Sequence, residues 1–392
     1  MGLLNDSEPV RRSLDLPRKV LVKDITLREG FGSGLFGIGV EEMTKIAEKL
    51  DEMNFPAIQI EFRGHSDDVK RNFKIIKEHV VKAKLDIINL CFSKDWKEIL
   101  DAATEVGVDS VCYSLPCSEL EKKNSLRSES EAFERIVEAV EYGRGIGLET
   151  HLHIMDAPRT DIAFIKKACR TAIDTKVDGV GISDTWGVAS PAAWRYLVGE
   201  VKKVTLDKPF SIHCHNDFGQ ALANTLAGVE AGADNVDASI NGYGERSGMP
   251  SLDEVVAALT MLYGMETGIK LDRMVELYRL FEELTGIPTA TTKPLVGKYA
   301  FSYHYDSRFT AYHVDPLLIL PFSPKVVGNE PTILFTRYSG PVVLEEKLRN
   351  LKLEVTTDRI PHLLERAKQQ LLREKKPFLT DQDIKALVWQ IS

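Results

Sequence analysis

Short apolar runs rich in β-branched residues recur along the first two thirds of the chain, and segments with helical spacing separate them. In the segments between the runs, apolar residues return every three or four positions, as in Val40–Met53, Trp96–Gly107 and Ala132–Gly147, which is the period of an amphipathic helix. The eight apolar runs are Val20–Ile25, Ala57–Phe62, Asp86–Phe92, Asp109–Leu115, Leu148–Ile154, Asp178–Ser183, Pro209–His213 and Asp234–Ile240.

Strands and helices that alternate in this way predict an α/β fold, a (β/α)8 TIM barrel over residues 19–285. An open, doubly wound sheet is the competing arrangement. Residues 1–18 carry no period and are interpreted as a loose leader.

The last third of the chain has a different pattern. Residues 286–340 are rich in loop-forming and aromatic residues, and we interpret them as a linker arm that contributes to the active site, because a long irregular segment in a compact protein is usually functional. Residues 341–392 carry three amphipathic segments, the last with Thr380 as its N-cap. They predict a small helical subdomain.

Composition narrows the class of protein. The formal net charge of -8 argues against a nucleic-acid-binding surface. No apolar run approaches the roughly 20 residues of a membrane span, and the first residues lack the apolar core of a signal peptide. We therefore expect a cytoplasmic protein without a membrane partner. Its five cysteines are scattered and lie mostly in apolar runs, so they are interpreted as reduced core residues.

Polar side chains follow several predicted strands, at the end where TIM barrels keep their active sites. Residues two apart on a strand point the same way, so His213 and His215 could present two imidazoles to one metal ion, or could form a hydrogen-bonded pair. With Glu29 they would leave open metal positions for a 2-oxo acid. Arg28 could stabilise an enolate or alkoxide oxygen, or could simply pair with Glu29.

Three separated motifs carry a family resemblance: DITLREG at Asp24–Gly30, HCHND at His213–Asp217 and NGYGERSGMPSLDEV at Asn241–Val255. They resemble the signatures of the acyl-CoA-dependent Claisen condensing enzymes of the metal-dependent TIM-barrel superfamily, the group of 2-isopropylmalate, homocitrate, citramalate and Re-citrate synthases. The resemblance implies an acyltransferase of amino-acid biosynthesis. Such an enzyme condenses acetyl-CoA with a 2-oxo acid held on Mg²⁺, Mn²⁺ or Zn²⁺, then hydrolyses the thioester to a malate- or citrate-like acid.

The same resemblance implies roles for single residues. Arg28 matches the catalytic arginine, and Thr185 matches a threonine that contacts the oxo-acid carboxylate. Glu245 belongs to a Gly-Glu-Arg loop near the acyl-CoA, and His313 falls where an arm histidine assists proton transfer. The residues that match the metal ligands are Glu29, His213 and His215.

The chain departs from the family pattern on its fifth strand. Homocitrate synthases have Arg and Ser at the positions of His151 and His153, where they hold the distal carboxylate of 2-oxoglutarate. That substrate is therefore not expected. The two histidines are candidates for contacts with another 2-oxo acid, or are packed inside the barrel. Arg63 and His65, after the second strand, are further candidates for binding a carboxylate.

Two other functions use the same residues. A metal-dependent aldolase or lyase of the 3-hydroxy-3-methylglutaryl-CoA lyase type would run related chemistry in reverse, but the GERSGMP segment replaces the cysteine loop of that lyase. A diverged barrel that acts as a binding subunit is the non-enzymatic alternative. Because an arm can reach into a neighbour's barrel, we expect a homodimer.

Overall fold

The computed structural model describes residues 5, 7, 8, 10, 16, 17 and 19–390, except residues 122–127 and 206. The chain divides into two compact units, Met1–Thr289 and Ala290–Ser392, which are described separately. The leader predicted for residues 1–18 lies largely outside the described residues. No helix in the part of the chain that the structure describes is long and apolar enough to cross a membrane.

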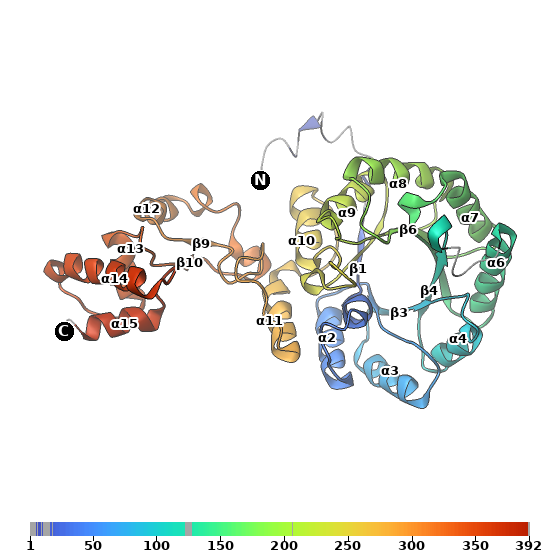
Figure 1. Cartoon of the computed structure of the whole chain (residues 1–392), viewed down its shortest axis with the longest axis horizontal. Coiled ribbons are helices and arrows are strands. Elements are labelled where there is room, and N and C mark those ends of the chain that lie inside the picture. Colours follow the sequence, from blue (N-terminus) through green and yellow to red (C-terminus); the bar gives the residue numbers. More distant parts are fainter. Residues whose placement is uncertain are drawn as a thin grey trace. The chain divides into compact units, whose positions relative to one another are not determined.

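The first unit is a closed barrel of eight strands that follow one another around the ring in chain order. Each pairs in parallel with the next, and β8 pairs with β1, where Val22 lies opposite Val236. This confirms the predicted TIM barrel (Figure 1). The strands are β1 (Leu21–Asp24), β2 (Ala57–Gln59), β3 (Lys84–Asn89), β4 (Ser110–Pro116), β5 (Glu149–Met155), β6 (Gly179–Asp184), β7 (Phe210–Cys214) and β8 (Asn235–Ala238).

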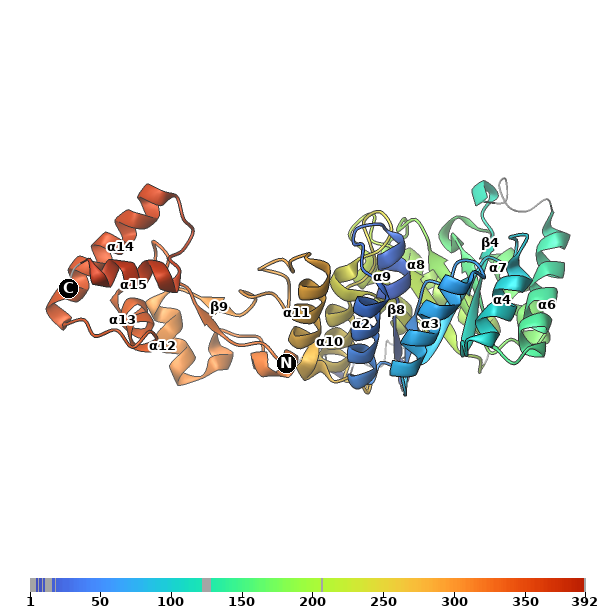
Figure 2. The ribbon, with the colours of Figure 1, turned by 90° about the horizontal axis from the view of Figure 1, so that it is seen from below.

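Helices surround the strands, as Figure 2 shows in a second view of the ribbon. The apolar stripes of these helices are buried. Trp194 on α8, for example, is completely buried. All five cysteines are free and buried. The helices are α2 (Val40–Glu52), α3 (Asp67–His79), α4 (Trp96–Glu105), α6 (Glu129–Gly145), α7 (Ile162–Asp174), α8 (Pro191–Thr205), α9 (Ala221–Glu230), α10 (Leu252–Ala257) and α11 (Met274–Thr285).

The second unit has its own apolar core, shared by four helices. They are α12 (Asp306–Val314), α13 (Pro341–Asn350), α14 (Ile360–Glu374) and α15 (Asp381–Trp389), with a two-stranded sheet of β9 (Ser302–Tyr303) and β10 (Thr332–Ile333). The last three helices agree with the amphipathic pattern. Thr380 caps α15, where its Oγ1 accepts a hydrogen bond from the Asp383 N–H at 3.2 Å.

Helix α12 was not predicted, because its few apolar residues form no continuous stripe. Tertiary contacts hold it instead: Phe309 is buried in the core, and the Asp306 carboxylate accepts hydrogen bonds from the N–H groups of Gly340 and Val343, at the start of α13. The Asp306 carboxylate on α12 thus caps the N-terminus of α13. Residues 290–392 form one compact unit. The sequence pattern suggested two parts for this region, a linker arm and a small helical subdomain.

Candidate active site

A pocket of about 550 Å³ lies at the carboxyl ends of the barrel strands. Most of the site residues predicted from the sequence line it. They come from strands β5 and β7 and from the segments that follow β1, β2, β6, β7 and β8. Those that line the pocket are Arg28, Glu29, Arg63, His153, Thr185, His213, His215 and Glu245.

Glu29 and Arg28 reach this pocket because a π-helical turn, Thr26–Gly30, follows β1 directly. The buried Asp24 carboxylate accepts hydrogen bonds from the N–H (3.0 Å) and the hydroxyl (2.8 Å) of Thr26. The Thr26 oxygen in turn accepts a hydrogen bond from the N–H of Ile240, after β8, at 2.9 Å. These contacts tie the turn to the segment after the neighbouring strand β8 and fix where its side chains point.

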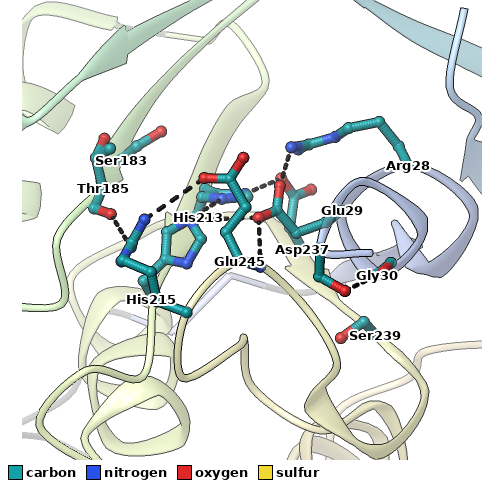
Figure 3. A network of polar contacts seen from close by, with 12 residues as sticks. Arg28, Glu29, Gly30, Ser183, Thr185, His213, His215, Asp237, Ser239 and Glu245 are labelled. Carbon is teal, nitrogen blue, oxygen red and sulfur yellow. Dashed lines mark hydrogen bonds and ion pairs between the residues drawn. The ribbon is translucent and has the colours of Figure 1, made fainter. Parts of the chain in front are cut away.

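Three ligand atoms converge from Glu29, His213 and His215, all within 4.8 Å of one another (Figure 3). The Nε2 atoms of the two histidines are 3.3 Å apart, and Nε2 of His215 is 3.7 Å from Oε1 of Glu29. All three side chains are buried. Two imidazole nitrogens and one carboxylate oxygen form a donor set that suits zinc and related divalent ions.

The surroundings of the two imidazoles fit a metal site. His213 donates from Nδ1 to Oδ2 of Asp237 at 3.0 Å, which leaves the lone pair of Nε2 facing the other ligand atoms, as second-shell carboxylates do in metal sites. Nδ1 of His215 is buried, and no described residue hydrogen-bonds to it. Burial, the neighbouring His213 and two arginines lower the pKa of His215 to about 3, so its ring is neutral and able to bind a metal.

Glu29 is ionised in this site. Burial raises its pKa, but the Arg28 guanidinium, the two imidazoles and the N–H of Glu245 outweigh that effect and lower the pKa to about 2. The Glu245 N–H donates to Oε1 of Glu29 at 3.1 Å. The Gly-Glu-Arg loop therefore contacts the ligand set through its backbone.

Arg28 lies between two partners. Its Nη1 contacts Oε2 of Glu29, and its Nε donates to Oε1 of Gln59 at 2.6 Å. The ion pair with Glu29 that the sequence left open as an alternative is thus formed. It does not remove Arg28 from the pocket, which both residues line.

Thr185 follows β6 at the pocket wall. Its hydroxyl oxygen accepts a hydrogen bond from the N–H of Asp156 at 2.8 Å, and the hydroxyl keeps its own proton to donate. Arg63 lies at the rim, where its side chain is 73% exposed and pairs with Glu61 at 2.5 Å. His65 is exposed and is not among the residues that line the pocket.

The two histidines of β5 lie at different levels of the barrel. His153 lines the pocket, and its Nδ1 and Nε2 lie 2.9 Å and 2.8 Å from the hydroxyls of Ser183 and Ser211. His151 instead contacts Glu149 at 3.1 Å and lines a second cavity at the amino end of the barrel. Alternate residues on a strand are about 6.6 Å apart. The structure therefore does not bring His151 to the pocket, and Met155 lines it two residues further along.

His313 lies in the second unit, on α12, where its ring is exposed. Its Nδ1 donates to the carbonyl oxygen of Phe309 at 3.0 Å. In the neutral ring this leaves Nε2 as the proton acceptor.

Two residues of the site were not singled out from the sequence. Asp237 contacts His213, and Gln59 contacts Arg28. Both line the pocket, Asp237 from within β8 and Gln59 from the end of β2. A polar residue in an otherwise apolar run was the available signal, because a buried carboxylate or amide needs a partner.

Comparison with known proteins identifies the family of the chain. The family model described as HMGL-like matches residues 19–281. Homocitrate synthase of Methanopyrus kandleri is 34% identical over 96% of this chain and 94% of its own. 2-Isopropylmalate synthase of Methanocaldococcus jannaschii is 33% identical over 96% of this chain and 72% of its own. The solved HMG-CoA lyase of Bacillus subtilis, 20% identical, has the same fold, with a TM-score of 0.61 over 70% of this chain and 96% of that one.

The fold and these matches define a TIM-barrel transferase. The chain belongs to the HMGL-like family, and its relatives put it with the condensing synthases that the three motifs resemble. The family predicted from those motifs is confirmed.

Proposed function

We propose that the protein is a cytoplasmic synthase that condenses acetyl-CoA with a 2-oxo acid and then hydrolyses the thioester. The observation that carries this proposal is the convergence of Glu29, His213 and His215 beside the Arg28 guanidinium in one pocket. A metal-ligand set and an adjacent fixed cation are what the addition of a carbon nucleophile to a keto group requires.

The three converging side chains would hold the divalent ion. When bound, the ion would supply Lewis-acid polarisation of the keto carbonyl and a template for its carboxylate. The protein groups complete the site: the Arg28 guanidinium stabilises negative charge on oxygen as it develops, and the Thr185 hydroxyl donates to the carboxylate of the oxo acid. Glu245 faces the acyl-CoA.

Proton removal from the acetyl methyl group needs a base within reach of the pocket. We assign this role to His313, because its Nδ1–H is engaged by the Phe309 carbonyl and its Nε2 is left as the acceptor. In a homodimer the second unit of one protomer would serve the barrel of its partner. Gel filtration with light scattering tests this assembly, and a monomer at micromolar concentration would contradict it.

The wall of the pocket opposite the ligand set favours an apolar substrate side chain. Strands β3–β5 lie across the ring from β7, β8 and β1, and this part of the lining includes Ile88, Ile99 and Met155. Among the described lining residues, the lysines and arginines are Arg28 and Arg63 alone, and each is paired with a glutamate. A second carboxylate would therefore meet no free cation. We propose a 2-oxo monocarboxylic acid with an apolar side chain, such as 2-oxoisovalerate.

The experiment is a thiol-release assay with purified, Mn²⁺-loaded protein and acetyl-CoA. Pyruvate, 2-oxoisovalerate, oxaloacetate and 2-oxoglutarate are supplied one at a time, and free CoA is measured. We expect release that needs both the metal and the oxo acid and that is fastest with 2-oxoisovalerate. No release with any oxo acid would overturn the proposal. Formation of acetoacetate and acetyl-CoA from 3-hydroxy-3-methylglutaryl-CoA would favour the lyase instead; because this cleavage releases no free thiol, acetoacetate is measured separately.

A further inference from the structure

Three charged side chains occupy the barrel interior below the pocket. Lys23 on β1 lies between Asp86 on β3 and Asp237 on β8: its Nζ is 2.9 Å from Oδ2 of Asp86 and 3.6 Å from Oδ1 of Asp237. Both carboxylates are less than 5% exposed. TIM barrels usually fill this space with branched apolar side chains, so a buried charged cluster here calls for a specific role.

One branch of the cluster leads to the metal-ligand set. Asp237 uses Oδ1 toward Lys23 and Oδ2 toward Nδ1 of His213, at 3.0 Å. The Asp237 carboxylate thus contacts the Lys23 ammonium with one oxygen and the His213 imidazole with the other. Because the Asp237 carboxylate decides which nitrogen of His213 carries the proton, its position sets the direction of the ligand lone pair.

The other branch leads to Arg28. Asp86 accepts hydrogen bonds from Nε2 of Gln59 at 2.6 Å and from the Ser110 hydroxyl at 2.8 Å. With its amide nitrogen engaged in this way, Gln59 presents Oε1 to Nε of Arg28 at 2.6 Å. The Asp86 carboxylate therefore orients the Gln59 amide and, through it, positions the Arg28 guanidinium.

Lys23 is the member common to both branches. Among the described residues, it is the one lysine or arginine that forms an ion pair with either carboxylate. Two buried carboxylates that share one ammonium lose their counter-charge together if the ammonium is removed. Each would then turn toward other donors, and this change would reach His213 and Arg28.

We propose that Lys23 is a positioning residue that aligns the metal ligand His213 through Asp237 and the guanidinium of Arg28 through Asp86 and Gln59. The part of this role that concerns catalysis rests on the proposed function, and the part that concerns metal binding does not. The effect on metal binding can be measured without any substrate.

The experiment uses the full chain, freed of metal, with Mn²⁺ as the probe. Lys23→Met is expected to weaken Mn²⁺ binding by about 10- to 100-fold, the usual effect of disturbing a second-shell partner, and to lower kcat with 2-oxoisovalerate. Gln59→Leu cuts only the Arg28 branch, so kcat should fall while Mn²⁺ affinity stays at the wild-type value. Asp237→Asn cuts only the other branch and should weaken Mn²⁺ binding.

Lys84→Met is the matched control. Lys84 lines the same amino-end cavity as Lys23, but its side chain is 55% exposed and pairs with Glu149, away from both branches. An exposed ion pair of this kind contributes little, so this variant should keep wild-type Mn²⁺ affinity and kcat. Lys23→Arg, which keeps the charge, should recover part of the Mn²⁺ affinity that Lys23→Met loses.

Unchanged Mn²⁺ affinity in a folded Lys23→Met protein would overturn the positioning role, whatever the activity. If Lys23→Met does not fold, Lys23→Gln takes its place, because it removes the charge but keeps a donor, and it is judged by the same criterion. A wild-type protein that binds Mn²⁺ but condenses no oxo acid would overturn the proposed function, and the Mn²⁺ affinities would still decide the role of Lys23.

Discussion

The imidazole of His153 occupies the space that a side chain at Gly181 would fill. A Cβ atom at residue 181 would lie 2.0 Å from Nε2 of His153 and 2.3 Å from Oγ of Ser211. The two residues are register partners on β5 and β6, and one layer lower Gly179 makes the same room for His151. The histidines of β5 can point inward because the neighbouring strand has no side chains at these positions.

Gly181→Ala is therefore expected to destabilise the barrel. The added methyl group must displace the His153 ring and break its contacts with two serines, and overpacking of this kind costs roughly 1–3 kcal/mol. Urea unfolding measures the change. Gly199→Ala, inside α8 where the nearest atom to the new methyl is 4.0 Å away, should be neutral or stabilising. Equal stabilities for the two variants would count against the close approach at residue 181.

His153 should make the free energy of unfolding depend on pH. Burial is the main cause that lowers its pKa from 6.5 to about 3. The unfolded chain takes up a proton near pH 6.5 and the folded protein does not until about pH 3. Unfolding is therefore progressively favoured as the pH falls between these values. Over two pH units this amounts to on the order of 2–3 kcal/mol.

His153→Gln should remove that part of the pH dependence. The free energy of unfolding of metal-free protein, measured in urea at pH 6.5 and 4.5, should fall less for this variant than for the wild type. His65→Gln, on an exposed loop, should behave as the wild type does. If His153→Gln and the wild type lose the same stability on acidification, the neutral buried imidazole is not the cause.

Arg28→Lys should lower kcat without releasing the metal. Lysine keeps the positive charge that holds Glu29 ionised, but it lacks the planar fork that reaches Glu29 and Gln59 together. Loss of one positioned oxyanion donor typically costs about 10²- to 10³-fold in kcat. Steady-state thiol release and Mn²⁺ titration measure the two properties. Arg63→Lys, at the exposed rim, is the control, and an equal loss in both variants would refute a special role for Arg28.

Ile88→Ala should change substrate preference. Ile88 lies on β3, across the barrel from the ligand set, and lines the pocket. The methylene groups that it loses are worth roughly 10- to 200-fold in kcat/KM for a branched oxo acid, whereas pyruvate is too short to contact them. Thiol release with 2-oxoisovalerate and with pyruvate gives the ratio. Val81→Ala, 84% exposed, should leave it unchanged. A parallel loss for both substrates would show that the wall does not select the side chain.

Much of this architecture was predictable from local pattern. The strand and helix periods indicate the eight units, and the closed barrel follows from them. The two-residue spacing of His213 and His215 predicts one shared face, because side chains alternate along a strand. The Thr380 cap and the last three helices were also predictable, since capping and amphipathic spacing act within a few residues.

Other features depended on how distant segments meet. His151 and His153 on β5 were both candidates for contacts with an oxo acid, with packing inside the barrel as the alternative. The register of β5 in the barrel decides between them, since His153 lines the pocket and His151 lies at the amino end. Helix α12 forms because Phe309 and Asp306 find partners in the second unit. A period in the sequence carries no information about such partners.

The sequence by itself determined the order of strands and helices and the family, and it indicated the candidate metal ligands, because these depend on residue type and short spacing. The tertiary structure decided which strand faces which, and so it brought Asp237 to His213, Gln59 to Arg28 and Lys23 between two carboxylates. These contacts join residues far apart in the chain. Only the closure and register of the barrel set their distances.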